Sequence, residues 1–213
     1  SYAAKTPGST ASKKCLDWPS TSENQVWASS SFAEPSGTDI SISYWVKTGV
    51  GGSGQHWLDF RDSSDDQSFA IRRLYDDLYI DLHDTGGGAN QWKWESSLTA
   101  STWFHHTIVF NRNSNHVAPV LYKNNGTAIT AVKTAGTETG QIRDVERVYI
   151  GDKKQNNSNY EADAYLQDVI VWTKSLDSAD AASLYNEGVS INAAGHASSS
   201  YIDNWWSRVC WWY

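Results

Sequence analysis

The sequence has no methionine and only two cysteines among its 213 residues, and it lacks any apolar run of about 18 residues that would span a membrane. Its first segment, SYAAKTPGSTASKK, has no apolar centre, so we do not expect a signal peptide there. Positive charge is scarce, because 17 lysines and arginines face 24 aspartates and glutamates, for a net charge of −7. A surface of this sign repels phosphate backbones, so neither nucleic acid nor a membrane interior is an expected partner.

The two cysteines, Cys15 and Cys210, stand near opposite ends of the sequence. A disulfide between them would tie these ends together, and closing so long a loop contributes about 4–5 kcal/mol in the chain-entropy model. Two buried free thiols are the alternative that the sequence leaves open. No C-x-x-C pair occurs, so the cysteines alone do not predict a metal site.

Catalytic patterns are missing as well. Retaining glycosidases use two carboxylates that face each other across the scissile bond, and an E-x-D-x-x-E or E-x-D-x-E strand would supply them. The sequence offers only EADAY at 161–165, in which Glu161 and Asp163 have no second glutamate. A serine nucleophile elbow and an H-E-x-x-H motif are also absent. We therefore do not expect an enzyme, and a polysaccharide-active enzyme that uses Glu161 or Asp163 is kept only as the third alternative.

Aromatic residues are abundant, with 12 tryptophans and 11 tyrosines, which bury large rings yet keep a polar group for an interface or a sugar. Short segments that alternate apolar and polar residues, the pattern of half-buried strands, recur along the chain. They lie at 40–48, 56–61, 68–74, 77–83, 91–96, 103–111, 147–153 and 164–174. Asn125-Gly126, between two β-rich runs in 116–133, predicts a hairpin.

One helix is predicted at 175–188, which opens on serine and aspartate and closes at Gly188. Many short strands with a single late helix predict an all-β fold, a two-sheet antiparallel jelly-roll sandwich with one short C-terminal helix. Residues 1–14, rich in serine, threonine, alanine and lysine, are expected to be a mobile N-terminal arm. Residues 15–213 are expected to form one domain that includes a tryptophan-rich C-terminal strand.

The closing segment AYLQDVIVWTKSLDSADAASLYNEG (164–188) resembles the last strand and helix of laminin-G-like, concanavalin A-like lectin/glucanase domains. Other segments match landmarks of that family in the correct order, namely CLDWPSTSENQVWA (15–28), DISISYWVKT (39–48), STWFHHTIVFNR (101–112) and LYKNNGTAI (121–129). The resemblance covers residues 15–190 and implies the same jelly-roll fold. The ending LYNEGVSINAAGHASSSYIDNWWSRV (184–209) is similar to that of laminin-G-like proteins of tailed phages.

After that ending the sequence departs from the family with VCWWY. The resemblance implies that Trp205 and Trp206 belong to a last strand beside the first strand, near Cys15. The final aromatics exceed what one edge strand needs, so they either fold back over the sandwich or contact a neighbouring subunit. These residues are Trp211, Trp212 and Tyr213.

The outward-facing positions of neighbouring strands predict a ligand surface. Aromatic rings stack on sugar C–H faces while carboxylates, guanidinium groups and imidazoles fix the hydroxyl groups, and the family often binds glycans on one sheet face. An ordinary solvated β face with cross-strand pairs is the alternative. The candidate ligand-binding residues are Trp57, Arg61, Tyr79, Asp81, His83 and His105, with Asp59 beside them.

A metal site is less directly encoded. His105 and His106 are successive strand residues that point to opposite faces, so they cannot chelate one ion; His106 is expected in the core and His105 on the surface. The run DSSDD at 62–66 is acidic but lacks the spacing and glycine of an EF-hand. The resemblance implies one structural calcium ion held by Asp17 and Asp168, with a hydrogen-bonded, turn-supporting Asp168 as the alternative.

The leading hypothesis from the sequence is a non-enzymatic virion protein of a tailed phage, either a capsid decoration or a tail-associated module, located in an extracellular particle. Its sandwich would contact virion proteins or glycans on a host surface, and the aromatic ending would allow an oligomer. A secreted carbohydrate-binding or adhesion module is the second hypothesis, in which Trp57, Tyr79 and His83 contact the ligand.

Overall fold

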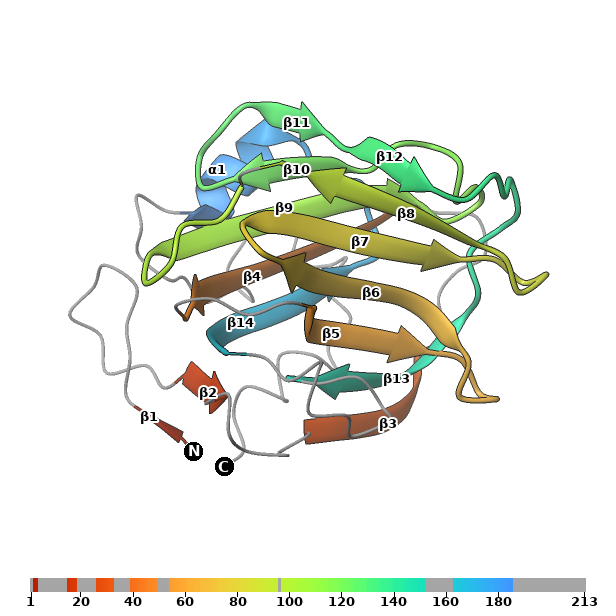
Figure 1. Cartoon of the computed structure of the whole chain (residues 1–213), viewed down its shortest axis with the longest axis horizontal. Helices are drawn as coiled ribbons and strands as arrows, with labels where there is room; N and C mark the ends of the chain where they lie inside the picture. The colour runs from red at the N-terminus through yellow and green to blue at the C-terminus, as the bar shows by residue number, and fades with distance from the viewer. Residues whose placement is uncertain are drawn as a thin grey trace.

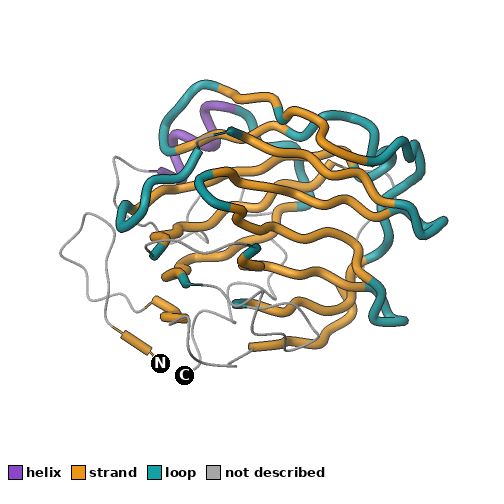
Figure 2. The backbone as a smooth tube through the Cα atoms, in the orientation of Figure 1, coloured by secondary structure: helices purple, strands orange, loops and turns teal. Residues whose placement is uncertain are grey.

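The computed structural model describes residues 2–3, 15–18, 26–32, 39–49, 54–95, 97–151 and 163–185, and of the first three ranges only the backbone. Two seven-stranded antiparallel sheets pack against each other, as the sequence predicts (Figure 1). Turns join the strands at two opposite ends of the sandwich, and a short helix lies beside one sheet (Figure 2). Among the described residues, no helix is long and apolar enough to cross a membrane.

The first sheet, sheet A, has the order β1-β2-β14-β4-β9-β10-β11. Its strands are β1 (Tyr2–Ala3), β2 (Cys15–Trp18), β14 (Ala164–Trp172), β4 (Asp39–Thr48), β9 (Trp103–Asn111), β10 (Val120–Lys123) and β11 (Ala128–Thr130). Strand β1 falls within the segment predicted to be a mobile arm, and Tyr2 pairs there with Leu16. The rest of that segment, 4–14, lies outside the described residues.

The second sheet, sheet B, has the order β12-β8-β7-β6-β5-β13-β3. Its strands are β12 (Val132–Ala135), β8 (Ala89–Trp94), β7 (Asp77–His83), β6 (Gln67–Leu74), β5 (Gln55–Arg61), β13 (Val145–Ile150) and β3 (Val26–Phe32). Strands β5 to β8 follow one another in sequence and in space, so their turns alternate between the two ends of the sandwich. The chain crosses from β11 of sheet A to β12 of sheet B through Ala131, whose N–H donates to the Pro119 carbonyl at 2.9 Å.

The core lies between the two sheets and follows the predicted alternation. A regular strand turns every second side chain inward because successive residues of a pleated strand point to opposite faces. The inward sets are Ile40, Ile42, Tyr44 and Val46 of β4, Leu78, Ile80 and Leu82 of β7, and Trp92 and Trp94 of β8, all buried. The hairpin predicted at Asn125-Gly126 also forms, since Leu121 of β10 pairs with Ile129 of β11.

The prediction that Trp57 faces outward is wrong. Strand β5 pairs with β6 through His56↔Arg72 and Leu58↔Ile71, so Trp57 is an extra residue on the β5 side of the pair. Such a bulge breaks the period-2 alternation locally. Trp57 is fully buried in the core, and its ring meets the edge of Tyr44 with centroids 6.4 Å apart. Trp57 is therefore a structural residue, and no ligand reaches it on the face of the sheet.

Helix α1 (Ser178–Tyr185) begins directly after its N-cap residue, Asp177. The Asp177 carboxylate accepts the backbone N–H groups of Ala179 and Asp180, both at 2.9 Å, which satisfies the first orphan donors of the helix. Leu184 packs with Trp172 in a small apolar cluster on the outer side of sheet A. The helix therefore covers part of that face, while the predicted stop at Gly188 lies outside the described residues.

Candidate functional site

The outer face of sheet B carries a group of paired polar side chains that we call the polar face; its members are Asp59, Arg61, Gln67, Arg72, Tyr79, Asp81 and Tyr149. Arg72 pairs across strands with Tyr79, and its guanidinium carbon lies 4.5 Å from the centre of that ring. The same guanidinium group binds Asp81, with Nε 2.6 Å from Oδ2. One arginine therefore holds both an aromatic ring and a carboxylate in fixed positions.

A second arginine pair lies on the neighbouring strand of the polar face. Arg61 donates from Nε to Asp59 Oδ2 at 2.9 Å, and Gln67 Nε2 donates to the other carboxylate oxygen at 2.6 Å. The Asp59 side chain is fully buried, so this pairing compensates a charge that would otherwise be costly in the interior. Arg61 Nη1 also donates to the Asp65 carbonyl at 2.7 Å, which links the sheet face to the β5–β6 turn.

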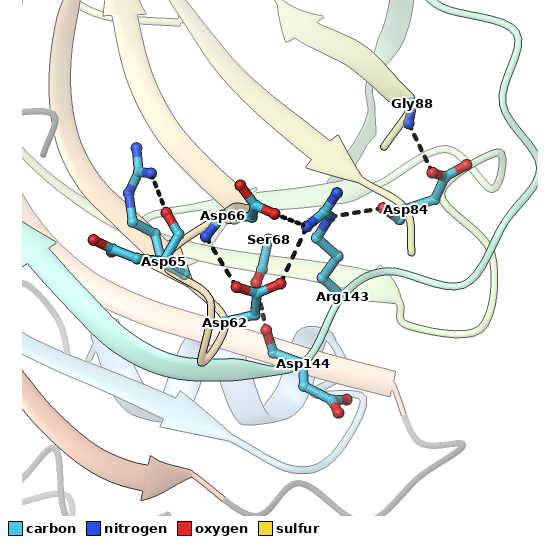
Figure 3. Close-up of polar contacts among 9 residues, drawn as sticks. Asp62, Asp65, Asp66, Ser68, Asp84, Gly88, Arg143 and Asp144 are labelled. Atoms are coloured by element: carbon cyan, nitrogen blue, oxygen red, sulfur yellow. Dashed lines mark hydrogen bonds and ion pairs between the residues drawn. The ribbon is translucent and has the colours of Figure 1, made fainter. Parts of the chain in front are cut away.

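At one end of the sandwich a third arginine joins three loops (Figure 3), and we call this group the Arg143 cluster; it consists of Arg143, Asp62, Asp66 and Asp84. Arg143 Nη1 lies 2.7 Å from Asp66 Oδ2 and 3.1 Å from Asp62 Oδ2, while Nε donates to the Asp84 carbonyl at 2.8 Å. The hydrogen bond to Asp66 is the main cause that raises the pKa of Arg143. The cluster thereby fixes the β5–β6, β7–β8 and β12–β13 connections relative to one another.

The acidic run 62–66 holds this guanidinium group, so two of its carboxylates, those of Asp62 and Asp66, already have a cationic partner. Across the part of the chain that the structure describes, no group of three or more histidine, cysteine, aspartate or glutamate side chains is arranged to bind a metal ion. Asp168 has a left-handed φ of 50° and accepts a 3.3 Å hydrogen bond from Gln167 Nε2. The β2 register places Asp17 opposite Tyr165, and its side chain lies outside the described residues, so calcium binding stays a prediction.

The structure brings four of the six predicted ligand residues together. Arg61, Tyr79 and Asp81 belong to the polar face, but Arg61 and Tyr79 are buried, at 7% and 8% exposure, and only Asp81 is half-buried. His83 lies at the end of the same strand as Asp81, half-buried beside the Arg143 cluster. The backbone N–H of Arg143 donates to the His83 carbonyl at 3.0 Å. Trp57 is separated from this group by its position in the core.

His105 is also separated from the group, because β9 belongs to sheet A. It points to the side opposite His106, as predicted, but the expectation that it lies on the surface is wrong, since it is 3% exposed. The Trp45 ring, which stacks on Tyr185 of α1, covers it at 5.1 Å. Burial lowers the pKa of His105 to about 3. His106 is in the core, with Nδ1 3.1 Å from the Tyr44 hydroxyl, and burial likewise lowers its pKa.

Sequence reasoning identified Arg61 but missed the two other arginines that organise the site, Arg72 and Arg143. Arg72 stands in the tandem Arg72-Arg73, and the alternation of β6 alone would have placed one of the two beside Tyr79. Arg143 lies in the β12–β13 connection, and nothing in the neighbouring sequence indicates its contacts with Asp84, Asp66 and Asp62, which lie 59, 77 and 81 positions away. The cysteine pair and the predicted interface residues at 205–213 cannot be placed, because the side chain of Cys15 and all of 186–213 lie outside the described residues.

The arrangement is suited to binding rather than to acid–base chemistry. Among the described residues of the polar face and the Arg143 cluster, Asp59, Asp81, Asp62 and Asp66 each contact an arginine. General acid–base hydrolysis of a glycoside needs two carboxylates that face a substrate, not a guanidinium group. Asp163 contributes its carbonyl to a 2.7 Å hydrogen bond from the Gly49 N–H, and Glu161 lies outside the described residues.

Comparison with known proteins bears on both fold and family. A family model described as the concanavalin A-like lectin/glucanases superfamily matches residues 20–182. The chain is similar to the botulinum neurotoxin serotype G binding domain, with 16% identity and a TM-score of 0.60 over 82% of this chain and 42% of that one. It is also similar to the serotype D ligand binding domain in complex with N-acetylneuraminic acid, with 13% identity and a TM-score of 0.58 over the same shares. The chain thus spans less than half of each of these domains, and a search of curated protein sequences finds no match.

Proposed function

The chain belongs to the concanavalin A-like lectin/glucanases superfamily, and from this we propose that it is a non-enzymatic module that binds glycans or proteins through the polar face of sheet B. The observation that carries the proposal is the arrangement of Arg72, Tyr79 and Asp81, in which a ring and a carboxylate share one guanidinium group. Sugar hydroxyl groups both donate and accept hydrogen bonds, so the half-buried Arg72 and Asp81, held rigidly over the buried Tyr79 ring, favour their recognition.

The pairing of these groups also lowers the cost of binding. Side chains that are already held by ion pairs lose little conformational freedom when a ligand arrives. A complex of one structural neighbour with N-acetylneuraminic acid supports the glycan class, although that domain is more than twice as long as this chain. We therefore propose glycans as the first ligand class and a protein surface as the second.

A glycan array tests this proposal. We expect the purified chain to give reproducible hits that weaken in Arg72→Gln, because this change removes the group that positions Tyr79 and Asp81. Ile129→Thr is the matched control, since Ile129 is 44% exposed on β11 of the other sheet. Hits that persist unchanged in Arg72→Gln would contradict binding at the polar face, and an array without hits would leave only a protein ligand.

The non-enzymatic part of the proposal has its own test. A panel of β-glucans and alginates incubated with the chain should show no new reducing ends or unsaturated products. Turnover that disappears in Asp163→Asn would contradict it and favour the polysaccharide-active alternative.

We further propose that the module is a structural protein of a tailed-phage virion, either a capsid decoration or a tail-associated part, with a secreted adhesion module as the alternative. The resemblance of 184–209 to the endings of such proteins and the aromatic residues that follow it support this location. Sedimentation velocity of the full chain and of a chain ending at residue 207 tests it. We expect self-association or binding to virion proteins only with the aromatic ending; a full chain that remains monomeric and binds no virion protein would contradict the assembly role.

A further inference from the structure

Tyr75 has an unusual place at the turn between β6 and β7. Leu74 pairs with Asp77, so Tyr75 and Asp76 form a two-residue hairpin turn. The Tyr75 side chain is 70% exposed, more than any other large hydrophobic residue in the described ranges. Its φ is 56°, in the left-handed region, and hairpin turns of this length normally put glycine, asparagine or aspartate there.

Tyr75 differs in side-chain size from the other described non-glycine residues with positive φ. Within the described residues they are Asp65, Ser101, Asn124 and Asp168, all with short polar side chains. A bulky ring is disfavoured at such a backbone position, and residues that break a local rule concentrate at functional sites. Solvent surrounds most of the ring, so packing does not explain the choice of tyrosine at this position.

A buried arginine holds the turn in place. Arg73 is 1% exposed, and its Nε donates to the Tyr75 carbonyl at 2.5 Å. Its Nη1 donates to the Gly49 carbonyl at 3.1 Å, and the Leu98 N–H donates to the Asp76 carbonyl at 3.0 Å. The turn is therefore tied to the segments that follow β4 and β8, and the exposed ring stands on a rigid base.

The charges around the turn are mostly negative. The side chain of Asp76 is 71% exposed next to Tyr75, and that of Glu95 is 69% exposed at the end of β8. Lys93 is shared between Asp77 and Glu95, at 3.5 and 2.9 Å. Asp76 Oδ1 also lies 3.7 Å from Nη2 of the buried Arg73, so the Asp76 carboxylate is held in place while most of it faces solvent. The excess of carboxylates disfavours anionic ligands, and the exposed carboxylate oxygens can accept hydrogen bonds from hydroxyl groups.

We infer that Tyr75 is a stacking platform for a neutral pyranose ring of a saccharide, with Asp76 accepting hydrogen bonds from its hydroxyl groups. This inference rests on the proposed glycan-binding function and adds a second ligand contact to the one proposed on the polar face. The second contact lies at the β6–β7 turn, and the Arg143 cluster lies at the other end of β6 (Figure 1). An exposed ring on a rigid turn binds a flat sugar face with little loss of conformational freedom. The core of a protein–protein interface, in contrast, is depleted of charged residues, and charged side chains flank this turn.

Saturation-transfer difference NMR with a panel of neutral and sialylated oligosaccharides tests the inference on the full chain. We expect transfer to neutral oligosaccharides and an affinity at least about tenfold lower in Tyr75→Asn, the loss of one stacking contact. Tyr75→Phe keeps the ring and should bind within about threefold of the wild type, which the same conversion treats as a minor change. Tyr75→Asn should unfold at the same or a higher temperature, because asparagine tolerates the left-handed backbone, so reduced binding would not reflect misfolding.

The possible outcomes separate this inference from the proposed function. Transfer to sialylated ligands alone, or transfer to neutral ligands that Tyr75→Asn leaves unchanged, overturns the Tyr75 platform and keeps glycan binding. Absence of transfer to any oligosaccharide overturns both the platform and glycan binding. Loss of transfer in Tyr75→Asn together with its retention in Tyr75→Phe supports the platform.

Discussion

Arg143 Nη1 lies 2.7 Å from Asp66 Oδ2, although the two residues are 77 positions apart in the sequence. The contact joins the turn after β5 to the loop before β13, and a second bond from the same nitrogen reaches Asp62 at 3.1 Å. The guanidinium group thus binds both carboxylates and offsets the repulsion between their negative charges at the end of the sandwich.

Replacing Arg143 by alanine should therefore destabilise the fold. We expect a loss of about 1–2 kcal/mol in the free energy of unfolding, because two partly exposed ion pairs and one hydrogen bond to the Asp84 carbonyl disappear. Urea denaturation measures the change. The stability of Arg143→Lys should lie between those of the wild type and Arg143→Ala, because lysine keeps the positive charge but not the several N–H donors of the guanidinium group. Equal stability of Arg143→Ala and the wild type would contradict a structural role of the cluster.

Truncating Trp57 should be much more damaging. Because its ring is fully buried between the sheets, Trp57→Ala should lower the free energy of unfolding by about 3–5 kcal/mol. Ile129→Ala, at an exposed position, is the control and should change stability by less than about 0.5 kcal/mol. A tolerated Trp57→Ala would return this residue to the surface and restore the ligand role that the sequence predicted for it.

Acid should destabilise the protein through its two buried histidines. Burial holds the pKa of His105 at about 3 and lowers that of His106, so the unfolded chain, with histidines near pKa 6.5, binds more protons than the folded one. Their contribution to stability is complete above pH 6.5 and is lost as the pH falls toward 3, at up to about 1.4 kcal/mol per pH unit for each histidine.

Unfolding midpoints in urea between pH 7 and pH 4 measure this dependence. His105→Phe keeps a ring beside Trp45 but removes one titrating group, so its stability should fall less steeply with acid. Identical slopes for His105→Phe and the wild type would show that His105 is not buried in its neutral form.

The calcium site implied by the family resemblance is checked by the metal itself. We expect millimolar calcium to raise the unfolding temperature of the chelator-treated protein and to have no such effect on Asp168→Asn. Gln167→Ala is the companion variant, since it removes the hydrogen bond to Asp168 but no proposed ligand. A wild type that does not respond to calcium would favour the alternative, a hydrogen-bonded carboxylate that supports the local backbone, here at the register shift between Gln167 and Ile170 in β14.

Much of the fold follows from local pattern. The alternation of β7 and β9 sets which side chains face the core, because the pleat fixes the direction of every side chain in a regular strand. The Asp177 cap sets the start of α1, and the hairpin signal at Asn125-Gly126 joins β10 to β11. The family landmarks follow one another along the chain in the same order as the strands in which they lie.

The site depended more on contacts between distant residues. A single extra residue in β5 turned Trp57 from the surface to the core, and the helix with Trp45 covered His105 on the far side of sheet A. The alternation of apolar and polar residues predicts neither feature. A bulge is seen only in the pairing with the neighbouring strand, and burial by another element is seen only in the tertiary packing.

The sequence by itself determined two facing β layers and most of their inward side chains, because these depend on the period of each strand. Only the tertiary structure decided which arginine each carboxylate meets, as Arg72 meets Asp81 across one hairpin and Arg143 meets Asp66 across two loops. The period of a strand does not indicate which charged side chains meet, so their partners are fixed by the positions of neighbouring strands and loops in space.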